Sequence, residues 1–209
     1  MTGVVTPVRG RFVAFEGGEG CGKSTQARRL ADALGAVATR EPGGTAVGSR
    51  LREILLDPGT VDLADRAEAL LMAADRAQHL AELVAPTLAT GRHVVSDRSA
   101  YSSIAYQGYG RGLPIAEVRG LSEWAADGVW PDLVVLLEVP HDVASGRLTG
   151  GLDRMERLGD AFHRRVGEGF RELAAAEPDR WVVVDGTEPV DQVAAAVRGA
   201  VAERLQLLG

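Results

Sequence analysis

The segment from Gly17 to Ser24 constrains the fold of this chain more than any other part of its sequence. It reads GGEGCGKS and matches the pattern G-x-x-x-x-G-K-[ST]. An apolar run that ends at Glu16 precedes it, and a helical pattern begins at Lys23. A strand, a glycine-rich turn and a helix in this order predict a phosphate-binding loop at the carboxyl edge of a parallel sheet.

The residue types of this loop explain how it binds phosphate. Glycines let backbone N–H groups converge on phosphate oxygens, and the following helix adds the positive end of its dipole. Lys23 is placed to reach the outer phosphates, and the Ser24 hydroxyl to sit on a magnesium ion that bridges them. The motif therefore predicts that a nucleoside triphosphate is bound by Gly17, Gly18, Glu19, Gly20, Cys21, Gly22, Lys23, Ser24 and Thr25. The alternative is a glycine-rich turn that only caps a helix.

Short valine-rich runs alternate with longer helical patterns along the chain. Strands are expected at 11–16, 36–40, 93–97, 133–139 and 181–185, and helices at 23–34, 47–56, 64–89, 115–126, 160–176 and 189–208. This alternation predicts an α/β fold of three layers, in which helices cover both faces of a five-stranded parallel sheet. No repeat or long linker divides the 209 residues, so we expect a single domain over 1–209.

The charge and the cysteine content exclude several classes of function. With 23 basic and 29 acidic residues the net charge is −6, so the chain is not built to coat nucleic acid. The one cysteine, Cys21, rules out an intrachain disulfide and a cysteine zinc cluster, and it favours a reducing compartment. The longest strongly apolar run, 133–137, is too short to span a bilayer. We therefore expect a cytoplasmic protein without nucleic-acid or membrane partners.

The basic residues are almost all arginine. Of the 23, only Lys23 is a lysine, and it belongs to the phosphate loop. A GTPase reads guanine with an Asn/Thr-Lys-x-Asp motif, which needs a second lysine, so this class is excluded. Motors and helicases are longer and carry further motifs. The length and the loop together favour a small nucleotide or nucleoside kinase.

Asp97 and Arg98 end the expected strand 93–97, where the side chains of a parallel sheet face the ligand crevice. An aspartate at this place suits a magnesium-bound water. The planar fork of an arginine beside it suits an acceptor phosphate. The alternative for this pair is a salt bridge at the end of the strand.

Five short blocks of sequence occur in a fixed order along the chain. They are FEGGEG at 15–20, TREPGGT at 39–45, AADRAQ at 73–78, DR at 97–98 with SS at 102–103 and AYQG at 105–108, and LDRME at 152–156. In this order and spacing, the chain resembles the bacterial thymidylate kinases over essentially its whole length. The resemblance implies a P-loop kinase fold, transfer of the γ-phosphoryl group of ATP to dTMP to give dTDP, a need for Mg²⁺, and a homodimer.

Met72 and Arg76 are four residues apart on an expected helix, so an apolar surface and a hydrogen-bond donor share one face. By the resemblance, Arg76 binds a carbonyl of the base, Ser103 contacts the base edge and Gln107 lines the pocket. Met72 departs from the family, in which many members have a phenylalanine that stacks on thymine. The polarizable sulfur of methionine can also cover a ring. The alternative for Met72 is a simple core residue.

The sugar and the phosphate of the acceptor have their own expected partners. By the resemblance, Tyr106 packs against the deoxyribose where a 2′-hydroxyl would otherwise fit, and Glu19 contacts the region of the 3′-hydroxyl. Arg40 clamps the acceptor phosphate from the side opposite Arg98. The second pKa of a phosphate monoester is about 6, so the acceptor is largely ionised at neutral pH and its phosphorylation needs no general base.

Residues 146–159 carry four glycines, three arginines and two acids, which predicts a mobile lid. Arg147 and Arg154 are expected to swing over the phosphates and exclude water. By the resemblance, they supply the positive charge that the phosphate loop lacks. Thr149 stands where some relatives have another arginine. The alternative is a solvated charged loop. The expected catalytic residues are Lys23, Arg98, Arg147 and Arg154, and the expected metal ligands are Ser24 and Asp97.

Two other functions stay open at this point. The departure at Met72 leaves room for a kinase that acts on another deoxynucleoside monophosphate or on a nucleoside. Outside the enzymes, the alternative is a catalytically silent regulator that binds a nucleotide. The presence of Lys23, Asp97, Arg98 and Arg154 favours an enzyme.

Overall fold

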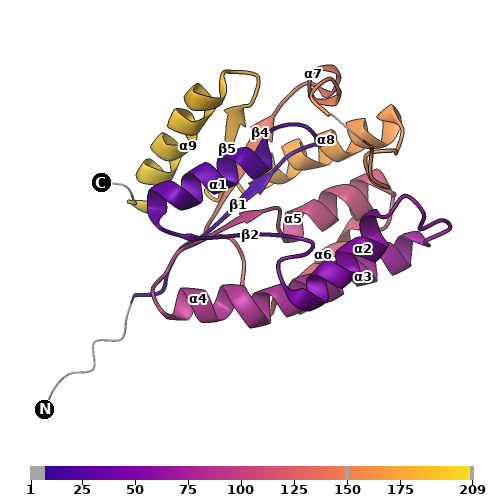
Figure 1. Cartoon of the computed structure of the whole chain (residues 1–209), viewed down its shortest axis with the longest axis horizontal. Helices are drawn as coiled ribbons and strands as arrows, with labels where there is room; N and C mark the ends of the chain where they lie inside the picture. The colour runs from indigo at the N-terminus through magenta and orange to yellow at the C-terminus, as the bar shows by residue number, and fades with distance from the viewer. Residues whose placement is uncertain (1–7, 149–150, 208–209) are drawn as a thin grey trace, which may run out of the picture.

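The computed structural model describes residues 8–148 and 151–207, and in them the chain forms one five-stranded sheet (Figure 1). The strands are β1 (Phe12–Glu16), β2 (Val37–Arg40), β3 (Val94–Asp97), β4 (Leu133–Glu138) and β5 (Trp181–Asp185). They pair in the order β2-β3-β1-β4-β5, and every pair is parallel. The predicted α/β fold with its five-stranded parallel sheet is confirmed.

Helices cover both faces of this sheet (Figure 1). On one face, α1 (Lys23–Leu34) packs against α9 (Val190–Leu205). The other helical segments are α2 (Ala46–Leu56), α3 (Asp65–His79), η1 (Leu80–Val84), α4 (Ala85–Ala89), α5 (Ala100–Ser103), η2 (Ile104–Gly110), α6 (Ile115–Ala126), α7 (His141–Ser145) and α8 (Asp160–Ala176). Among the residues described, no helix is long and apolar enough to cross a membrane.

The central strand β1 is buried on both faces, which explains why its sequence is apolar throughout. Val13 and Phe15 point into the cluster that packs under α1 and α9, whereas Phe12 packs with Leu80 and Val84 on the opposite face. A strand of a parallel sheet that is covered twice needs apolar residues at successive positions, without alternation. The strand order reverses around β1, so the crevice at its carboxyl end is the place where ligands bind in such sheets.

The expected helix 64–89 is helical from Asp65 to Ala89, but it is not one regular α-helix. Its middle, η1, is a π-helical segment, and Pro86 follows in the first turn of α4. Proline lacks an N–H, and its ring clashes with the carbonyl group four residues earlier in an α-helix. The wider π-helical turn before Pro86 avoids this clash.

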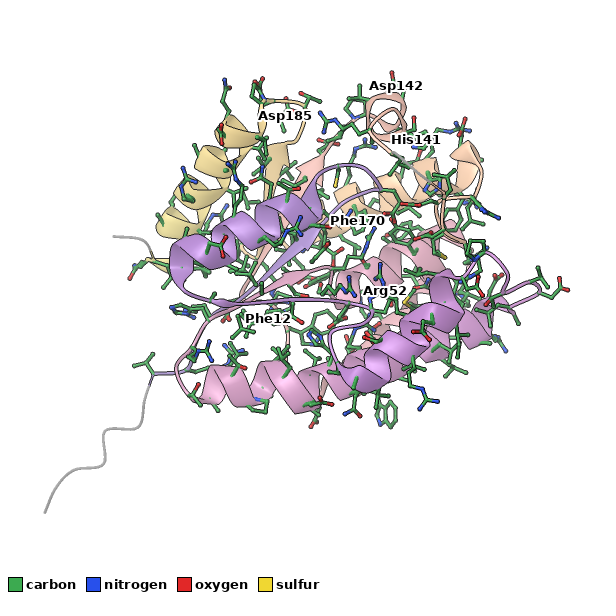
Figure 2. All side chains as sticks on the ribbon, viewed as in Figure 1. Phe12, Arg52, His141, Asp142, Phe170 and Asp185 are labelled. Atoms are coloured by element: carbon green, nitrogen blue, oxygen red, sulfur yellow. The ribbon has the colours of Figure 1, made fainter. Side chains whose placement is uncertain are left out.

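The segments α5, η2 and α7 are shorter than the periodicity of a sequence can resolve. In the expected lid, 146–159, Met155 is buried in the apolar cluster of Tyr106 and Phe162. The mobility of the lid stays a prediction. Figure 2 shows Asp142 of α7 and Asp185 at the edge of the molecule, whereas Arg52 of α2 points toward its middle.

Candidate active site

The phosphate loop lies at the carboxyl end of β1, and its tight path depends on glycine. Gly17 has φ 140°, and a Cβ there would lie 2.6 Å from the carbonyl oxygen of Leu137. Lys23 begins α1 and is buried, and its Nζ donates a hydrogen bond of 2.6 Å to the carbonyl oxygen of Gly18. The phosphate loop therefore holds the ammonium group of its own lysine in place.

Ser24 and Asp97, the expected metal ligands, lie together at the start of α1 and the end of β3. The Ser24 hydroxyl donates to Asp97 Oδ2. The other carboxylate oxygen, Asp97 Oδ1, is buried and has no hydrogen-bond partner among the described residues. A hydroxyl beside an unpaired carboxylate oxygen fits Mg²⁺, which takes one or two carboxylates and keeps several waters. No cluster of three or more His, Cys, Asp or Glu side chains that could hold a metal is present in 8–148 and 151–207.

Arg98 joins the phosphate loop to the side chains that follow β3. Its backbone is left-handed, with φ 76°, a conformation that non-glycine residues seldom adopt outside functional sites. Its guanidinium group donates to Glu19, to the Tyr106 hydroxyl at 3.0 Å and to the Ser102 hydroxyl at 3.1 Å. Tyr106 in turn donates to Glu19 at 2.7 Å. The structure thus brings Glu19, Arg98 and Tyr106 together.

Glu19 is a carboxylate in the middle of a phosphate loop, and cations keep it ionised. Burial alone would raise its pKa, but the charges of Arg98 and Lys23 and the hydrogen bond from Tyr106 outweigh burial and lower the pKa to about 2. The opposite charge of Glu19 likewise raises the pKa of Arg98 against its own burial. The pair is therefore charged at every physiological pH.

Arg76 on α3 is buried with its partners at the far end of a cavity. Its Nε donates to Glu41 Oε2 at 3.1 Å, and its Nη2 donates to the Ser103 hydroxyl at 2.8 Å. Glu41 is held from its other side by His79, at 3.0 Å. The pKa of Glu41 is lowered, because Arg76 and the hydrogen bond of His79 outweigh burial. A fixed guanidinium group beside a hydroxyl forms the end wall of the cavity.

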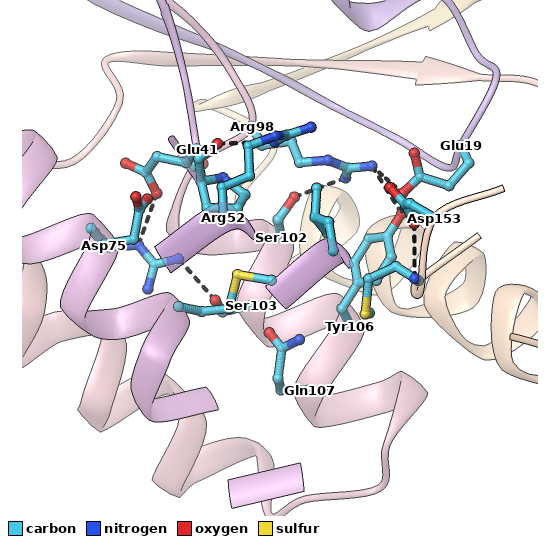
Figure 3. A pocket seen from close by; sticks show the side chains of 16 residues that line it. Glu19, Glu41, Arg52, Asp75, Arg98, Ser102, Ser103, Tyr106, Gln107 and Asp153 are labelled. Carbon is cyan, nitrogen blue, oxygen red and sulfur yellow. Dashed lines mark hydrogen bonds and ion pairs between the residues drawn. The ribbon is translucent and has the colours of Figure 1, made fainter. Parts of the chain in front are cut away.

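This space, which we call the inner cavity, runs from Glu41 and Asp75 at one end to Glu19 and Tyr106 at the other (Figure 3). Arg98 and Ser102 lie between the two ends. All of the residues expected to bind the base line the inner cavity: Met72, Arg76, Ser103 and Gln107. The expected sugar contacts, Glu19 and Tyr106, line it too.

A second space, the phosphate hollow, adjoins the inner cavity on the side of the phosphate loop. It is lined by Lys23, Ser24, Asp97 and Arg40, and it shares the walls Glu19, Glu41, Arg52, Arg98 and Asp153 with the inner cavity. The two spaces therefore adjoin along this shared wall. Sequence reasoning placed Arg40 and Arg98 here.

Arg52 is a functional residue that sequence reasoning missed. It lies on α2, where an arginine in a helical pattern looks like any solvated charge. In the structure, its Nη1 donates to the carbonyl oxygen of Pro42 at 2.9 Å, and its side chain faces the shared wall. Burial lowers the pKa of Arg52, and the charges of Arg40 and Arg98 lower it further. Arg40, Arg52 and Arg98 thus line the phosphate hollow together, beside the carboxylates of Glu19, Glu41 and Asp153.

Glu16 is a second residue that the sequence did not single out. It ends β1, is fully buried, and accepts four hydrogen bonds: from the backbone N–H and hydroxyl groups of Ser99 and of Ser102, at 2.6 to 3.2 Å. It thereby holds the turn that carries Arg98. Burial raises the pKa of Glu16 to about 7, although Arg98 and the serines lower it. A glutamate at the end of an apolar strand was the available signal.

The lid arginines donate hydrogen bonds to groups outside the phosphate loop in this structure. Arg147 donates to the carbonyl oxygens of Gly186 and Thr187, at 2.9 and 3.5 Å. Arg154 donates to the carbonyl oxygen of Leu55 and to Glu68, at 2.7 and 2.6 Å. Thr149, which replaces an arginine of some relatives, lies outside the described residues. The catalytic role of the lid arginines stays a prediction.

Comparison with known proteins decides the family. A sequence profile described as thymidylate kinase matches residues 15–197. The chain belongs to the thymidylate kinase family. It is 47% identical over 204 residues to a thymidylate kinase of Bifidobacterium longum, which covers 94% of this chain and 99% of the relative. It is 48% identical over 210 residues to a thymidylate kinase of Solidesulfovibrio magneticus, over 93% of this chain and 100% of the relative.

A third relative, the thymidylate kinase of Leifsonia xyli, is 49% identical over 197 residues, 90% of this chain and 93% of its own length. These matches confirm the resemblance that the five blocks indicated. They also cover both the phosphate loop and the lid segment, so the two spaces described above belong to the part of the chain that is shared with thymidylate kinases.

Proposed function

We propose that this member of the thymidylate kinase family transfers the γ-phosphoryl group of ATP to dTMP, giving ADP and dTDP. One observation carries the proposal. The phosphate hollow and the inner cavity meet at the wall formed by Glu19, Arg52 and Arg98. A triphosphate on the loop and a nucleoside monophosphate in the inner cavity therefore place donor and acceptor phosphates side by side.

The donor lies on the phosphate loop. The backbone N–H groups of Gly17–Thr25 surround its phosphates, and Lys23 exchanges the Gly18 carbonyl for a phosphate oxygen. Ser24 and Asp97 would hold Mg²⁺, and the unpaired Asp97 Oδ1 supports this assignment. When bound, the ion neutralises part of the charge that the phosphates bring.

The acceptor fills the inner cavity. Arg76 and Ser103 meet the carbonyl edge of the base, Gln107 lines the wall and Met72 covers the ring. Tyr106 packs against the sugar beside Glu19. The acceptor phosphate lies among Arg40, Arg52 and Arg98, which line the phosphate hollow together.

Catalysis in this arrangement consists of positioning and charge neutralisation. The acceptor oxygen is already ionised at neutral pH, so no side chain has to remove a proton. Lys23 and Arg98 fix the reacting groups in line and stabilise the charge that spreads over the transferring group. Arg147 of the lid adds to this stabilisation once its contacts with Gly186 and Thr187 exchange for phosphate.

We also propose that the enzyme is a cytoplasmic homodimer. Leu70 of α3 and Trp124 of α6 are large apolar side chains, 59% and 80% exposed, on two helices that contact each other. Association with a second copy through this face removes both from water. The single buried thiol, Cys21, fits a reducing compartment.

An acceptor panel tests the proposed function. ADP release is measured with ATP, Mg²⁺ and, in turn, dTMP, dUMP, UMP, CMP, AMP, GMP and thymidine. We expect the highest kcat/KM with dTMP. Because Met72 stands where other members have an aromatic ring, the second candidate is a kinase of another nucleoside monophosphate, and a higher kcat/KM with such an acceptor would replace our proposal. Absence of turnover with every acceptor would favour a regulator.

A further inference from the structure

Glu68 is a fully buried carboxylate on α3 that no part of the proposed chemistry uses. Its Oε1 accepts from Gln107 Nε2 at 2.9 Å and from Arg111 Nε at 3.1 Å. Its Oε2 accepts from Arg111 Nη2 at 2.7 Å and from Arg154 Nη2 at 2.6 Å. Both oxygens are thus fully engaged by three side chains.

These partners keep Glu68 charged although water does not reach it. Burial alone would raise its pKa, but the hydrogen bonds of Arg111, Gln107 and Arg154 outweigh burial and lower the pKa. When Arg154 leaves, Arg111 still compensates the charge of Glu68, but Glu68 Oε2 loses a hydrogen bond that water cannot replace at a fully buried position. Release of Arg154 therefore has a cost that a solvated lid arginine would not have.

Arg154 is also bound along the rest of its length. Its backbone N–H donates to the carbonyl oxygen of Leu56 and its Nε donates to that of Leu55, both at the end of α2. The last carbonyl groups of a helix attract a cation. Arg154 thus ties the lid to α2 and α3 at once, and this double attachment differs from the swinging arginine that the sequence predicts.

Glu68 lies on the helix that also recognises the acceptor. Glu68, Met72 and Arg76 follow one another at intervals of four residues, so they share one face of α3. Gln107, a wall of the inner cavity, gives its amide N–H to Glu68, and its Oε1 is buried without a partner in the described part of the chain. The lid anchor and the base pocket are therefore built on the same rigid element.

We propose that Glu68 is a positioning residue that anchors the lid to the acceptor pocket, and that Arg154 acts through Glu68 instead of binding the transferring phosphate. The proposal rests on the proposed function, since it concerns the lid of that kinase. The Glu68–Arg154 contact holds the Arg154 part of the lid on α3.

Four variants test this inference: Arg154→Met, Glu68→Gln, the double variant, and Arg111→Met as the matched control. Arg111 binds the same carboxylate but lies after η2, outside the lid. With ATP and dTMP, we expect Arg154→Met and Glu68→Gln to lower kcat by similar factors, between about 10-fold and 100-fold. The double variant should be no worse than either single one, because both remove the same contact.

Limited proteolysis gives a readout that does not depend on catalysis. Arg147 and Arg157 are exposed residues of the lid segment at which trypsin can cut. Arg154→Met and Glu68→Gln should accelerate cleavage there, and Arg111→Met should leave it at the wild-type rate. Arg154→Lys, which keeps a charge on Glu68, should restore most of the protection. Urea unfolding confirms that each variant is folded before it is assayed.

Two results would overturn the inference. A large loss of kcat in Arg154→Met with an unchanged kcat in Glu68→Gln would make Arg154 a phosphate ligand. Equal lid cleavage in wild type and Glu68→Gln would show that Glu68 does not anchor the lid. If the wild type fails to phosphorylate dTMP, the proposed function fails instead, and the cleavage rates still decide the role of Glu68.

Discussion

The base end of the candidate site and its phosphate end satisfy their charges with different kinds of partner. At the base end, Arg76 is closed in by Glu41 and Ser103, and Glu41 by His79, all of them buried. These contacts lie at one end of the inner cavity, and we expect them to persist when a base enters it. The base end is therefore preorganised, and binding there needs little rearrangement.

At the phosphate end, the side chains that we propose for phosphate and metal binding make hydrogen bonds to other groups of the protein. Lys23 donates to Gly18, Ser24 to Asp97, and Arg98 to Glu19. A bound nucleotide has to exchange at least the first of these contacts. The phosphate end is thus held in shape by contacts that a bound ligand replaces. Its residues should therefore contribute more to turnover than to the free energy of unfolding.

The largest effect is expected for Lys23→Met at the phosphate end. Loss of the one ammonium group that reaches the phosphates should lower kcat with dTMP by about 1,000-fold. The free energy of unfolding should change by no more than about 1 kcal/mol, because the hydrogen bond of Lys23 stays within its own loop and Arg98 still compensates the charge of Glu19. ADP release and urea unfolding measure the two quantities. A variant that keeps a tenth of wild-type activity would contradict the role of Lys23.

Arg76→Met at the base end should lower both the free energy of unfolding and the affinity for dTMP. It leaves Glu41 as a buried charge with only His79 beside it, which should lower the free energy of unfolding by about 3–5 kcal/mol. Binding of dTMP, followed by calorimetry, should weaken as well. Arg76→Lys keeps a charge beside Glu41 and is the matched control. If Arg76→Met and the wild type unfolded at the same urea concentration, the contacts of Arg76 would not make the base end rigid.

Glu16 beneath the phosphate end gives a prediction about pH. Burial raises its pKa to about 7 in the folded protein, whereas an unfolded chain leaves it near 4.5. Between these values the folded state holds the proton, so this stabilisation is present below about pH 4.5 and is lost as the pH rises through 7. Over that range, wild type should lose about 3 kcal/mol relative to Glu16→Gln. If the free energy of unfolding changed with pH in the same way in both proteins, the pKa of Glu16 would not be raised.

The smallest effect is expected for Met72→Phe in the inner cavity. Both side chains cover a ring, and a change between large apolar residues usually costs less than about 1.5 kcal/mol. The preference for dTMP over dUMP, measured as the ratio of kcat/KM values, should change by less than about 10-fold. A larger change would show that Met72 sets the base specificity of this chain.

Much of this architecture could be predicted from the sequence, because it depends on residues that are close to one another in the chain. The strands around β1 are apolar runs, the phosphate loop is a contiguous motif, and Asp97 ends a strand, so their positions follow from neighbours in the chain. The short blocks carried the base residues Arg76 and Ser103, which lie 27 positions apart yet share a hydrogen bond.

The rest depended on contacts between distant parts of the chain. Arg52 has no local signal, because only the fold turns it toward Arg40 and Arg98. The composition around Arg154 indicates a mobile segment, but its partner Glu68 lies 86 positions earlier, and the pairing appears only when α3 is packed against the lid. Long-range ion pairs of this kind are invisible to periodicity and composition.

The transfer of phosphate from donor to acceptor is the central claim, and isotope labelling tests it most directly. The protein is incubated with Mg²⁺, dTMP and ATP labelled at the γ-phosphate, and the nucleotides are separated. In the wild type, we expect the label to appear at the β-phosphate of dTDP. Lys23→Met should transfer almost no label to dTMP. Label recovered only as free phosphate, or only in the product of another acceptor in a mixed pool, would contradict the central claim.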